Sequence, residues 1–335
     1  MKAVAAFLAL AGMLWGCTAL LSGCAGLAAP RGNQAVMPVI ESDVFVARDG
    51  MLLPLRHWDA AGAPRAIIVA LHGMSDYSNA FDKPGQLWAA DGITTLAYDQ
   101  RGFGRGPDPG LWPGGEALRT DLKDFVAAAR TRFPGVPLYA VGESMGGAVL
   151  LSALADADAP KLDGAILVAP AVWSRADMPL SYRVALFLAA HLMPGLIVSG
   201  NGLKIVPSDN VAMLRALSRD PYFQKQTRAD AVFGLVNLMD EARQAPSHLG
   251  PTPPMLFLYG RNDQIIPQEP TEAVIAALGA RVGVRAYDKG YHMLLRDLEG
   301  PVVNQDVADW IFLQKPLGNE SRIEPLSWLE QSGRR

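Results

Sequence analysis

Gly142-Glu143-Ser144-Met145-Gly146 is the stretch that decides the fold of this chain. The apolar residues 137–141 precede it, and the small and apolar residues 147–154 follow it. A serine between two glycines where a strand turns into a helix forms a nucleophile elbow, in which the strained serine raises its hydroxyl above the sheet. Gly142 and Gly146 let strand and helix approach closely. The alternative is a chance surface turn, which the flanking strand and helix disfavour.

Apolar strand-like segments alternate with helical segments on both sides of this elbow. The strand-like runs are residues 66–71, 94–98, 165–169, 255–259 and 284–287. Apolar residues at helical spacing occur in residues 81–89 and 118–129, and further helices are expected from about Glu269 and Val303. Asp49-Gly50 predicts an antiparallel hairpin at the sheet edge. The pattern predicts an α/β fold with a mostly parallel sheet and helices on both faces.

Residues 171–249 interrupt this alternation. They are helical in pattern and predict a helical cap inserted between two parts of the core, residues 41–170 and 250–315. Residues 24–40 are expected to form a tether, and residues 316–335 a polar C-terminal extension.

The first residues predict the compartment. The chain has no charged residue between Lys2 and Arg31, and its apolar start ends in Leu21-Ser22-Gly23-Cys24. This resembles a bacterial lipoprotein signal peptide, residues 1–23, which implies lipidation of Cys24. The expected location is the bacterial cell envelope, at the periplasmic face of the outer membrane if the cell has one. The alternative is an uncleaved transmembrane anchor, since residues 3–30 are long enough to span a bilayer.

Composition excludes several classes of function. Residues 25–335 contain no cysteine, which excludes disulfides, zinc–thiolate sites and a cysteine nucleophile there. The formal net charge is −3 and no long basic run occurs, so nucleic acid is not expected as a partner. No cofactor and no metal are predicted, and the oligomeric state is left open.

A serine nucleophile needs a base and an acid that orients the base. On this architecture the acid and the histidine follow the serine in that order. Asp263 follows the strand-like residues 255–259, and His292 follows the next strand. His57, His191 and His248 fit the role of base less well, because they lie on an edge strand, in the cap and in a connector. Ser144, Asp263 and His292 are therefore the predicted catalytic residues.

Acyl transfer also needs two backbone amides for the oxyanion. The residue after the nucleophile, Met145, is one candidate, and the loop after residues 66–71 supplies Met74 as the other. Gly73 is expected to permit the turn that points the Met74 amide inward. His72 is expected to brace this loop through its side chain.

Five separated motifs carry a resemblance to a known family: His72-Gly73-Met74-Ser75, Asp99-Gln100-Arg101-Gly102-Phe103-Gly104, Gly142-Glu143-Ser144-Met145-Gly146-Gly147, Gly260-Arg261-Asn262-Asp263 and Tyr291-His292. They resemble the monoacylglycerol lipase and lysophospholipase branch of the α/β-hydrolases, which is grouped with serine aminopeptidase-type hydrolases. The resemblance implies the α/β-hydrolase fold and the same three catalytic roles. It also implies that Asp99 and Arg101 fix a loop beside the oxyanion turn. Arg105 departs from the family pattern, which usually has a serine there.

The expected function is hydrolysis of monoacyl lipid esters, monoacylglycerols or lysophospholipids, through an acyl-enzyme. Short-chain or aryl carboxylesterase, aminopeptidase and non-catalytic lipoprotein remain alternatives. An aminopeptidase would need acids for the substrate ammonium, and Asp240-Glu241 are the cap candidates. Two apolar cap stretches, residues 184–190 and 192–198, are expected mostly to pack onto the main domain, or else to form an acyl tunnel whose rim contacts a membrane. The expected partners are thus a small lipid or ester and a membrane surface reached through lipidated Cys24.

Overall fold

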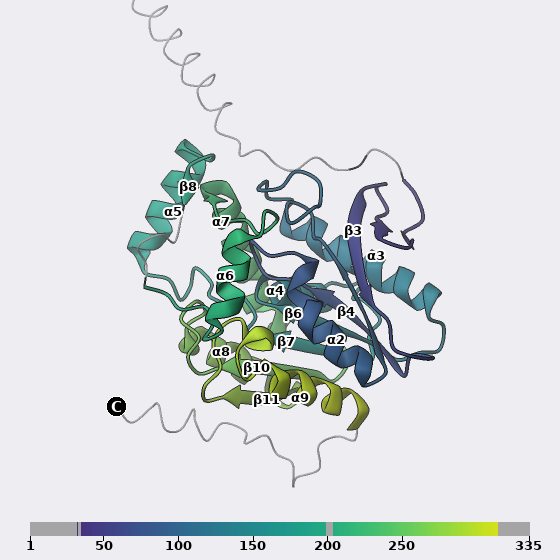
Figure 1. Cartoon of the computed structure of the whole chain (residues 1–335). Helices are drawn as coiled ribbons and strands as arrows, with labels where there is room; N and C mark the ends of the chain where they lie inside the picture. The colour runs from purple at the N-terminus through teal and green to yellow at the C-terminus, as the bar shows by residue number, and fades with distance from the viewer. Residues whose placement is uncertain (1–31, 33–34, 199–203, 314–335) are drawn as a thin grey trace, which may run out of the picture.

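A nine-stranded sheet forms the centre of the computed structural model, which describes residues 32, 35–198 and 204–313 (Figure 1). Its order is β1-β2-β3-β5-β4-β6-β7-β10-β11. The strands are β1 (Val39–Ile40), β2 (Val44–Val46), β3 (Leu52–Trp58), β4 (Ala66–Leu71), β5 (Ile93–Tyr98), β6 (Leu138–Glu143), β7 (Gly164–Val168), β10 (Met255–Gly260) and β11 (Val282–Tyr287). The strands from β5 to β11 in this order run parallel, whereas β1, β2 and β3 are antiparallel.

The central strands are apolar because both faces of the sheet are covered. Every residue of β4, β5, β6, β7 and β10 is buried. The predicted edge hairpin is formed by β2 and β3, and its turn contains Gly50 with a φ of 79°. The structure confirms the predicted fold class.

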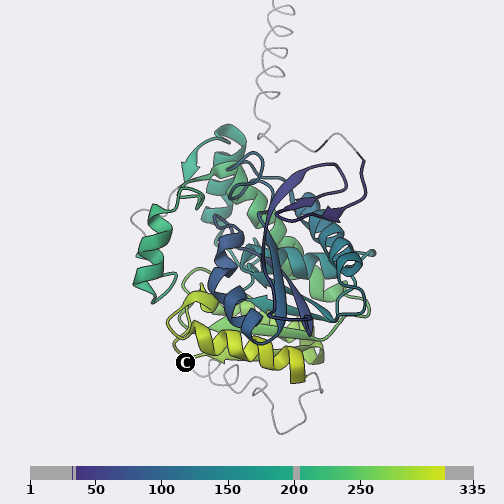
Figure 2. The ribbon, with the colours of Figure 1, turned by 45° about the vertical axis from the view of Figure 1, so that its right-hand side comes forward.

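Helices cover the two faces of the sheet (Figure 2). They are α2 (Asp82–Ala90), α3 (Gly115–Arg132), α4 (Met145–Leu154), α8 (Gln268–Leu278) and α9 (Gly300–Leu313). Trp88 of α2 and Val307 of α9 belong to the apolar cluster on one face, with Ile68. Phe125 of α3 and Val149 of α4 belong to the larger cluster on the other face. The sheet therefore has two separate hydrophobic cores.

The segment between β7 and β10 contains α5 (Leu180–Leu192), β8 (Ile197–Val198), α6 (Val211–Arg219), β9 (Thr227–Arg228) and α7 (Ala229–Gln244). In Figure 1 these elements lie at one side of the sheet, with α5 and β8 farthest out. Helix α7 packs against α4 and buries Leu238 and Met239, whereas α5 packs against α7.

Two expectations about the cap are wrong. Residues 192–198 do not form a helix, because α5 ends at Leu192, before Pro194-Gly195, and β8 then pairs with β9. Most of the apolar side chains also do not pack onto the main domain, since Ala190 is the one residue of α5 that is buried. The large apolar side chains exposed here are Leu180, Tyr182, Val184, Phe187, Leu188, Leu192, Met193, Leu196, Ile197 and Val198. A helix that is apolar all round has the same sequence pattern in a core and at a lipid-facing surface.

The leader with Cys24 and the predicted extension 316–335 lie outside the described residues. Among the helices of the described ranges, none has both the length and the apolar character that a membrane crossing requires.

Candidate active site

The loops that carry the predicted site all leave the sheet at the same edge. Leu71 at the end of β4 is paired with Gly142 near the end of β6, and Gly260 at the end of β10 is paired with Tyr287 at the end of β11. The carboxyl ends of parallel strands are where ligands and catalytic groups gather in open α/β sheets. The four loops that follow these strands therefore converge.

Ser144 stands between β6 and α4 in a strained backbone conformation. Its φ is 54° and its ψ is −115°, values that cost a non-glycine residue about 1–3 kcal/mol. Its amide donates to the carbonyl of Val168 at 2.9 Å, and its carbonyl accepts from Ala171 at 2.9 Å. These hydrogen bonds to the end of β7 and the residues after it hold the serine in its strained position.

The glycines around Ser144 are required by close backbone contacts. A Cβ on Gly146 would lie 2.1 Å from the carbonyl oxygen of Leu71, and one on Gly142 would lie 2.5 Å from that of Gly146. Gly73 serves a different purpose from the predicted turn, because its φ is not positive. A Cβ there would lie 3.2 Å from the Cβ of Ser144, and the residue of this loop with positive φ is Ser75, at 72°. Gly73 thus makes room for the nucleophile.

The structure brings the three predicted catalytic side chains together. Nε2 of His292 lies 2.9 Å from Oγ of Ser144, and Nδ1 of His292 lies 2.7 Å from Oδ2 of Asp263. The other carboxylate oxygen, Oδ1, accepts hydrogen bonds from the amides of Ile265 at 2.8 Å and Ile266 at 3.0 Å. The loop after β10 therefore fixes the acid, and the acid fixes the imidazole.

Two opposing effects act on the base. Burial lowers the pKa of His292, but the charge of Asp263 and its hydrogen bond raise this pKa and prevail, so that it lies above its ordinary value. A carboxylate beside an imidazole stabilises the protonated form. The pair is thus suited to take a proton from Ser144.

His72 braces the loop after β4 through its side chain, as predicted from the sequence. Nε2 of His72 accepts a hydrogen bond from the amide of Gln100 at 2.9 Å, so its Nδ1–H donates to the carbonyl of Gly73, also at 2.9 Å. Burial lowers the pKa of His72, which keeps the ring neutral. Met145 begins α4 directly after the nucleophile. The assignment of the Met74 and Met145 amides to the oxyanion stays a prediction.

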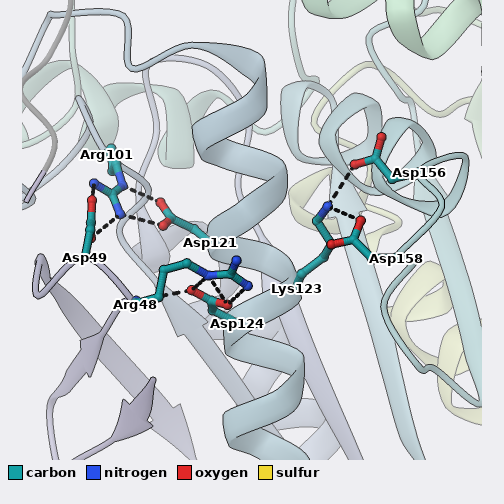
Figure 3. A network of polar contacts seen from close by, with 8 residues as sticks. All are labelled: Arg48, Asp49, Arg101, Asp121, Lys123, Asp124, Asp156 and Asp158. Atoms are coloured by element: carbon teal, nitrogen blue, oxygen red, sulfur yellow. Dashed lines mark hydrogen bonds and ion pairs between the residues drawn. The ribbon is translucent and has the colours of Figure 1, made fainter. Parts of the chain in front are cut away.

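Asp99 and Arg101 bind different partners. Arg101 donates to Asp121 at 2.6 Å and to Asp49 at 2.7 Å, which ties α3 to the β2–β3 turn (Figure 3). Asp99 accepts hydrogen bonds from the amide and Nε of Arg105 at 2.9 and 3.0 Å. Arg105, the residue that departs from the family pattern, is therefore one partner of Asp99, and the amide of Ser78 is another.

The remaining candidates are engaged elsewhere. His57 pairs with Asp59 at 2.8 Å, and Nδ1 of His191 lies 2.8 Å from the carbonyl oxygen of Phe187. The two cap acids considered for an aminopeptidase are both paired, Asp240 with Arg175 and Glu241 with Arg119. Within the described ranges, no group of three or more His, Cys, Asp or Glu residues is arranged to hold a metal ion.

These loops are supported by a set of side chains that no sequence motif predicted. Ser208 donates to Asp297 at 2.6 Å, and Arg296 pairs with Asp76 at 2.7 Å and with Glu143 at 3.2 Å. All five side chains are buried. The available signal is the charged pair Arg296-Asp297 directly after the apolar residues 293–295, close to the predicted base.

Comparison with known proteins gives the family of the chain. Residues 62–299 match the model of the family described as serine aminopeptidase, S33. The chain belongs to this family. It is 25% identical over 275 residues to a monoglyceride lipase of Rattus norvegicus (80% of this chain, 89% of the relative). It is 26% identical over 278 residues to a monoacylglycerol lipase of Mycolicibacterium smegmatis (80% and 95%).

Solved structures share the fold. The monoacylglycerol lipase of Paleococcus ferrophilus superposes with a TM-score of 0.65 at 20% identity, over 77% of this chain and 98% of the other. A soluble variant of the Saccharomyces cerevisiae monoglyceride lipase, in complex with a substrate analogue, gives 0.67 at 20% identity, over 85% and 98%. These likenesses and the family membership confirm the α/β-hydrolase resemblance.

Proposed function

We propose that this protein is a serine ester hydrolase that cleaves monoacyl lipids, monoacylglycerols first among them. The observation that carries the proposal is the position of His292, 2.9 Å from Oγ of Ser144 and 2.7 Å from Asp263. This is the arrangement of nucleophile, base and orienting acid that acyl transfer requires. The family and its monoglyceride lipase relatives support an ester as the substrate.

Acylation begins at Ser144. Its Oγ attacks the ester carbonyl carbon while its proton passes to Nε2 of His292, and Asp263 stabilises the imidazolium that forms. The negative charge that develops on the carbonyl oxygen would be met by the amides of Met74 and Met145. One such donor contributes about 3–4 kcal/mol to the stability of the transition state.

The intermediate then collapses and the ester C–O bond breaks. The leaving alcohol, glycerol for a monoacylglycerol, takes the proton from His292, and the acyl group stays on Ser144. Water then gives a proton to His292 and attacks the acyl carbon. The fatty acid leaves, and the proton returns to Ser144.

The exposed apolar face of the cap supports a substrate that arrives from a lipid phase. Phe187, Leu188 and Leu192 of α5 are all exposed, and so are Ile197 and Val198 of β8. Large exposed apolar side chains in such number are typical of surfaces that contact a partner or lipid. A monoacyl lipid is poorly soluble in water, so an enzyme that acts on it gains from contact with the phase that holds it.

We further propose that the protein is anchored by lipid in the bacterial cell envelope through Cys24. Support comes from the motif Leu21-Ser22-Gly23-Cys24 after an apolar leader. An anchor at this position would keep the enzyme beside its substrates.

Labelling and substrate profiling test the function. We expect the purified full chain to react with a fluorophosphonate probe and Ser144→Ala to remain unlabelled. Among monoacylglycerols, lysophospholipids, p-nitrophenyl esters and aminoacyl anilides, we expect the highest kcat/KM for long-chain monoacylglycerols. Absence of labelling in the wild-type protein would refute the proposed serine hydrolase activity. A maximum of kcat/KM at p-nitrophenyl esters would indicate a carboxylesterase instead, and a maximum at aminoacyl anilides would indicate an aminopeptidase.

A further inference from the structure

Three buried ionisable side chains form a cluster beside the triad. Nη2 of Arg296 lies 2.7 Å from Oδ2 of Asp76 and 3.2 Å from Oε2 of Glu143. The side chains of Arg296, Asp76 and Glu143 are 9%, 3% and 4% exposed. Charges buried this deeply are costly unless they are paired, and a guanidinium between two carboxylates is such a pairing.

Each member of the cluster comes from a different segment of the site. Asp76 lies in the loop after β4, two residues beyond Met74, and Glu143 is the last residue of β6, directly before Ser144. Arg296 ends the 3₁₀ turn η4 (Leu294–Arg296), which follows His292. One guanidinium thus joins the loop of the oxyanion donor, the nucleophile elbow and the loop of the base.

The cluster is poorly explained by stability alone. Among the described residues, Oε1 of Glu143 and Nε of Arg296 have no hydrogen-bond partner, although both atoms are buried. Unsatisfied buried polar atoms are destabilising, and buried ion pairs can often be replaced by apolar residues without loss of stability. A charged cluster kept at this position points to a role in the site.

We propose that Arg296 is a positioning residue for ester hydrolysis, which holds the loop of His292 against the nucleophile elbow and the oxyanion loop through Glu143 and Asp76. The proposal rests on the proposed serine chemistry. The guanidinium does not touch the reacting atoms, and it acts through the placement of His292.

The cluster also acts on the base through its charge. Besides burial and Asp263, Glu143 raises the pKa of His292 and Arg296 lowers it. Other ionisable side chains on the elements around His292 include His72, Asp76, Asp209 and Asp297. Removal of the Arg296 charge should therefore raise the pKa of the base, an effect that loss of packing alone would not produce.

The decisive variant is Arg296→Met, with Arg296→Lys as the conservative variant. Turnover is counted per active site titrated with a fluorophosphonate, so that unfolded protein does not contribute. For Arg296→Met we expect kcat to fall roughly 10- to 100-fold with KM within about twofold, because a small misplacement of a catalytic group is costly. The acidic limb of the pH profile of kcat/KM should move upward by about half a unit or more. Lysine should restore the limb and part of kcat.

The matched control is Arg285→Met, which removes the ion pair that the exposed Arg285 of β11 makes with Asp306 of α9. It should change neither kcat nor the pH profile. If Arg296→Met does not fold, Asp76→Asn decides. Oδ1 of Asp76 accepts the amide of Tyr77 at 2.9 Å while Oδ2 faces Arg296. Asparagine keeps an oxygen for the Tyr77 amide but removes the negative charge that faces Arg296, so kcat per site should again fall at least about tenfold.

Three results would overturn the proposal. They are wild-type kcat in Arg296→Met or in Asp76→Asn, a fall in kcat without a shift of the acidic limb in Arg296→Met, and an equal loss of kcat in the lysine variant. Each of these is read against an active wild-type enzyme. Absence of labelling in the wild type would instead refute the proposed function.

Discussion

The hydroxyl of Ser208 donates a hydrogen bond of 2.6 Å to Oδ1 of Asp297, and both side chains are buried. The other oxygen of Asp297 accepts the amide of Tyr291, also at 2.6 Å. Tyr291 directly precedes His292, so one carboxylate joins the segment before α6 to the loop of the base. The amide of Met293 strengthens this link, since it donates to the carbonyl of Pro207 at 3.0 Å. The position of the cap and the position of the base are therefore coupled.

Ser208→Ala should reduce both stability and turnover. The substitution leaves a buried carboxylate oxygen without its donor, which costs about 1–3 kcal/mol of unfolding free energy. Burial disfavours the charged form of Asp297 and raises its pKa to about 6, and the hydrogen bond from Ser208 opposes this effect. Loss of that hydrogen bond would therefore disfavour the carboxylate further. Urea unfolding and kcat measure the two effects. The control is Ser218→Ala on the exposed side of α6, where the hydroxyl donates to the Arg215 carbonyl at 2.8 Å. Wild-type kcat in Ser208→Ala would show that cap and base are independent.

Asp263→Asn should leave the fold intact and lower kcat by about 10⁴-fold, because the amide no longer selects the tautomer that accepts a proton from Ser144. Thermal unfolding and kcat with a soluble ester check the two statements. Asp288→Asn is the matched control, since this acid lies on the neighbouring loop and is exposed. Normal turnover in Asp263→Asn would mean that another acid orients the imidazole.

Asp49→Asn should destabilise the protein in a pH-dependent way. Burial acts to raise the pKa of Asp49, but Arg101 and the amides of Gly32 and Met51 outweigh it and lower this pKa to about 2. A carboxylate with a depressed pKa contributes stability above its unfolded value near 4, and this contribution is lost as the pH falls towards 2. We expect a loss of about 2 kcal/mol at pH 7 that shrinks below pH 4, measured by urea unfolding. An equal loss of unfolding free energy at pH 7 and below pH 4 would assign the effect to packing.

Leu188→Glu should separate lipid contact from chemistry. This side chain is 48% exposed on α5, so a charge there should not disturb the core. Activity on monoacylglycerol in vesicles should fall about tenfold because apolar contact with the lipid phase is weakened, while kcat for a water-soluble ester stays unchanged. Val302→Glu on α9, 56% exposed and far from the cap in sequence, is the control. Equal losses in both assays would place Leu188 in the substrate pocket rather than at the lipid surface.

Cys24→Ser should release the protein from the membrane fraction or leave the leader uncleaved. The measurement is cell fractionation with mass spectrometry of the N-terminal peptide. Absence of a diacylated Cys24 in the wild-type protein would rule out the lipid anchor.

Local patterns were sufficient to predict the sheet and the triad. Uninterrupted apolar runs such as residues 66–71 indicated strands buried on both faces, and the elbow around Ser144 fixed which strand ends carry chemistry. Asp263 and His292 could then be found by their position after the next strands.

The contacts that hold these residues in place could not be predicted. Asp76 and Arg296 lie far apart in the sequence, and their pairing depends on how the loops after β4 and β11 are placed by the sheet. The exposure of α5 could not be predicted either, because apolar periodicity does not distinguish a packed helix from an exposed one. Gly73 shows the same limit, since its role depends on how near Ser144 comes.

The attachment of residues 206–210 has a practical consequence for anyone who wishes to alter the cap by laboratory evolution. The amide of Val206 donates a hydrogen bond of 3.0 Å to Oε1 of Gln264, the residue after Asp263. Ser208 donates to Asp297, which holds the loop of His292. Randomising this stretch would select chiefly for repair of turnover, whereas α5, which packs on α7, can be diversified at little cost to the reaction. Libraries that adjust contact with the lipid phase should therefore be built on residues 180–192, whose side chains are mostly exposed.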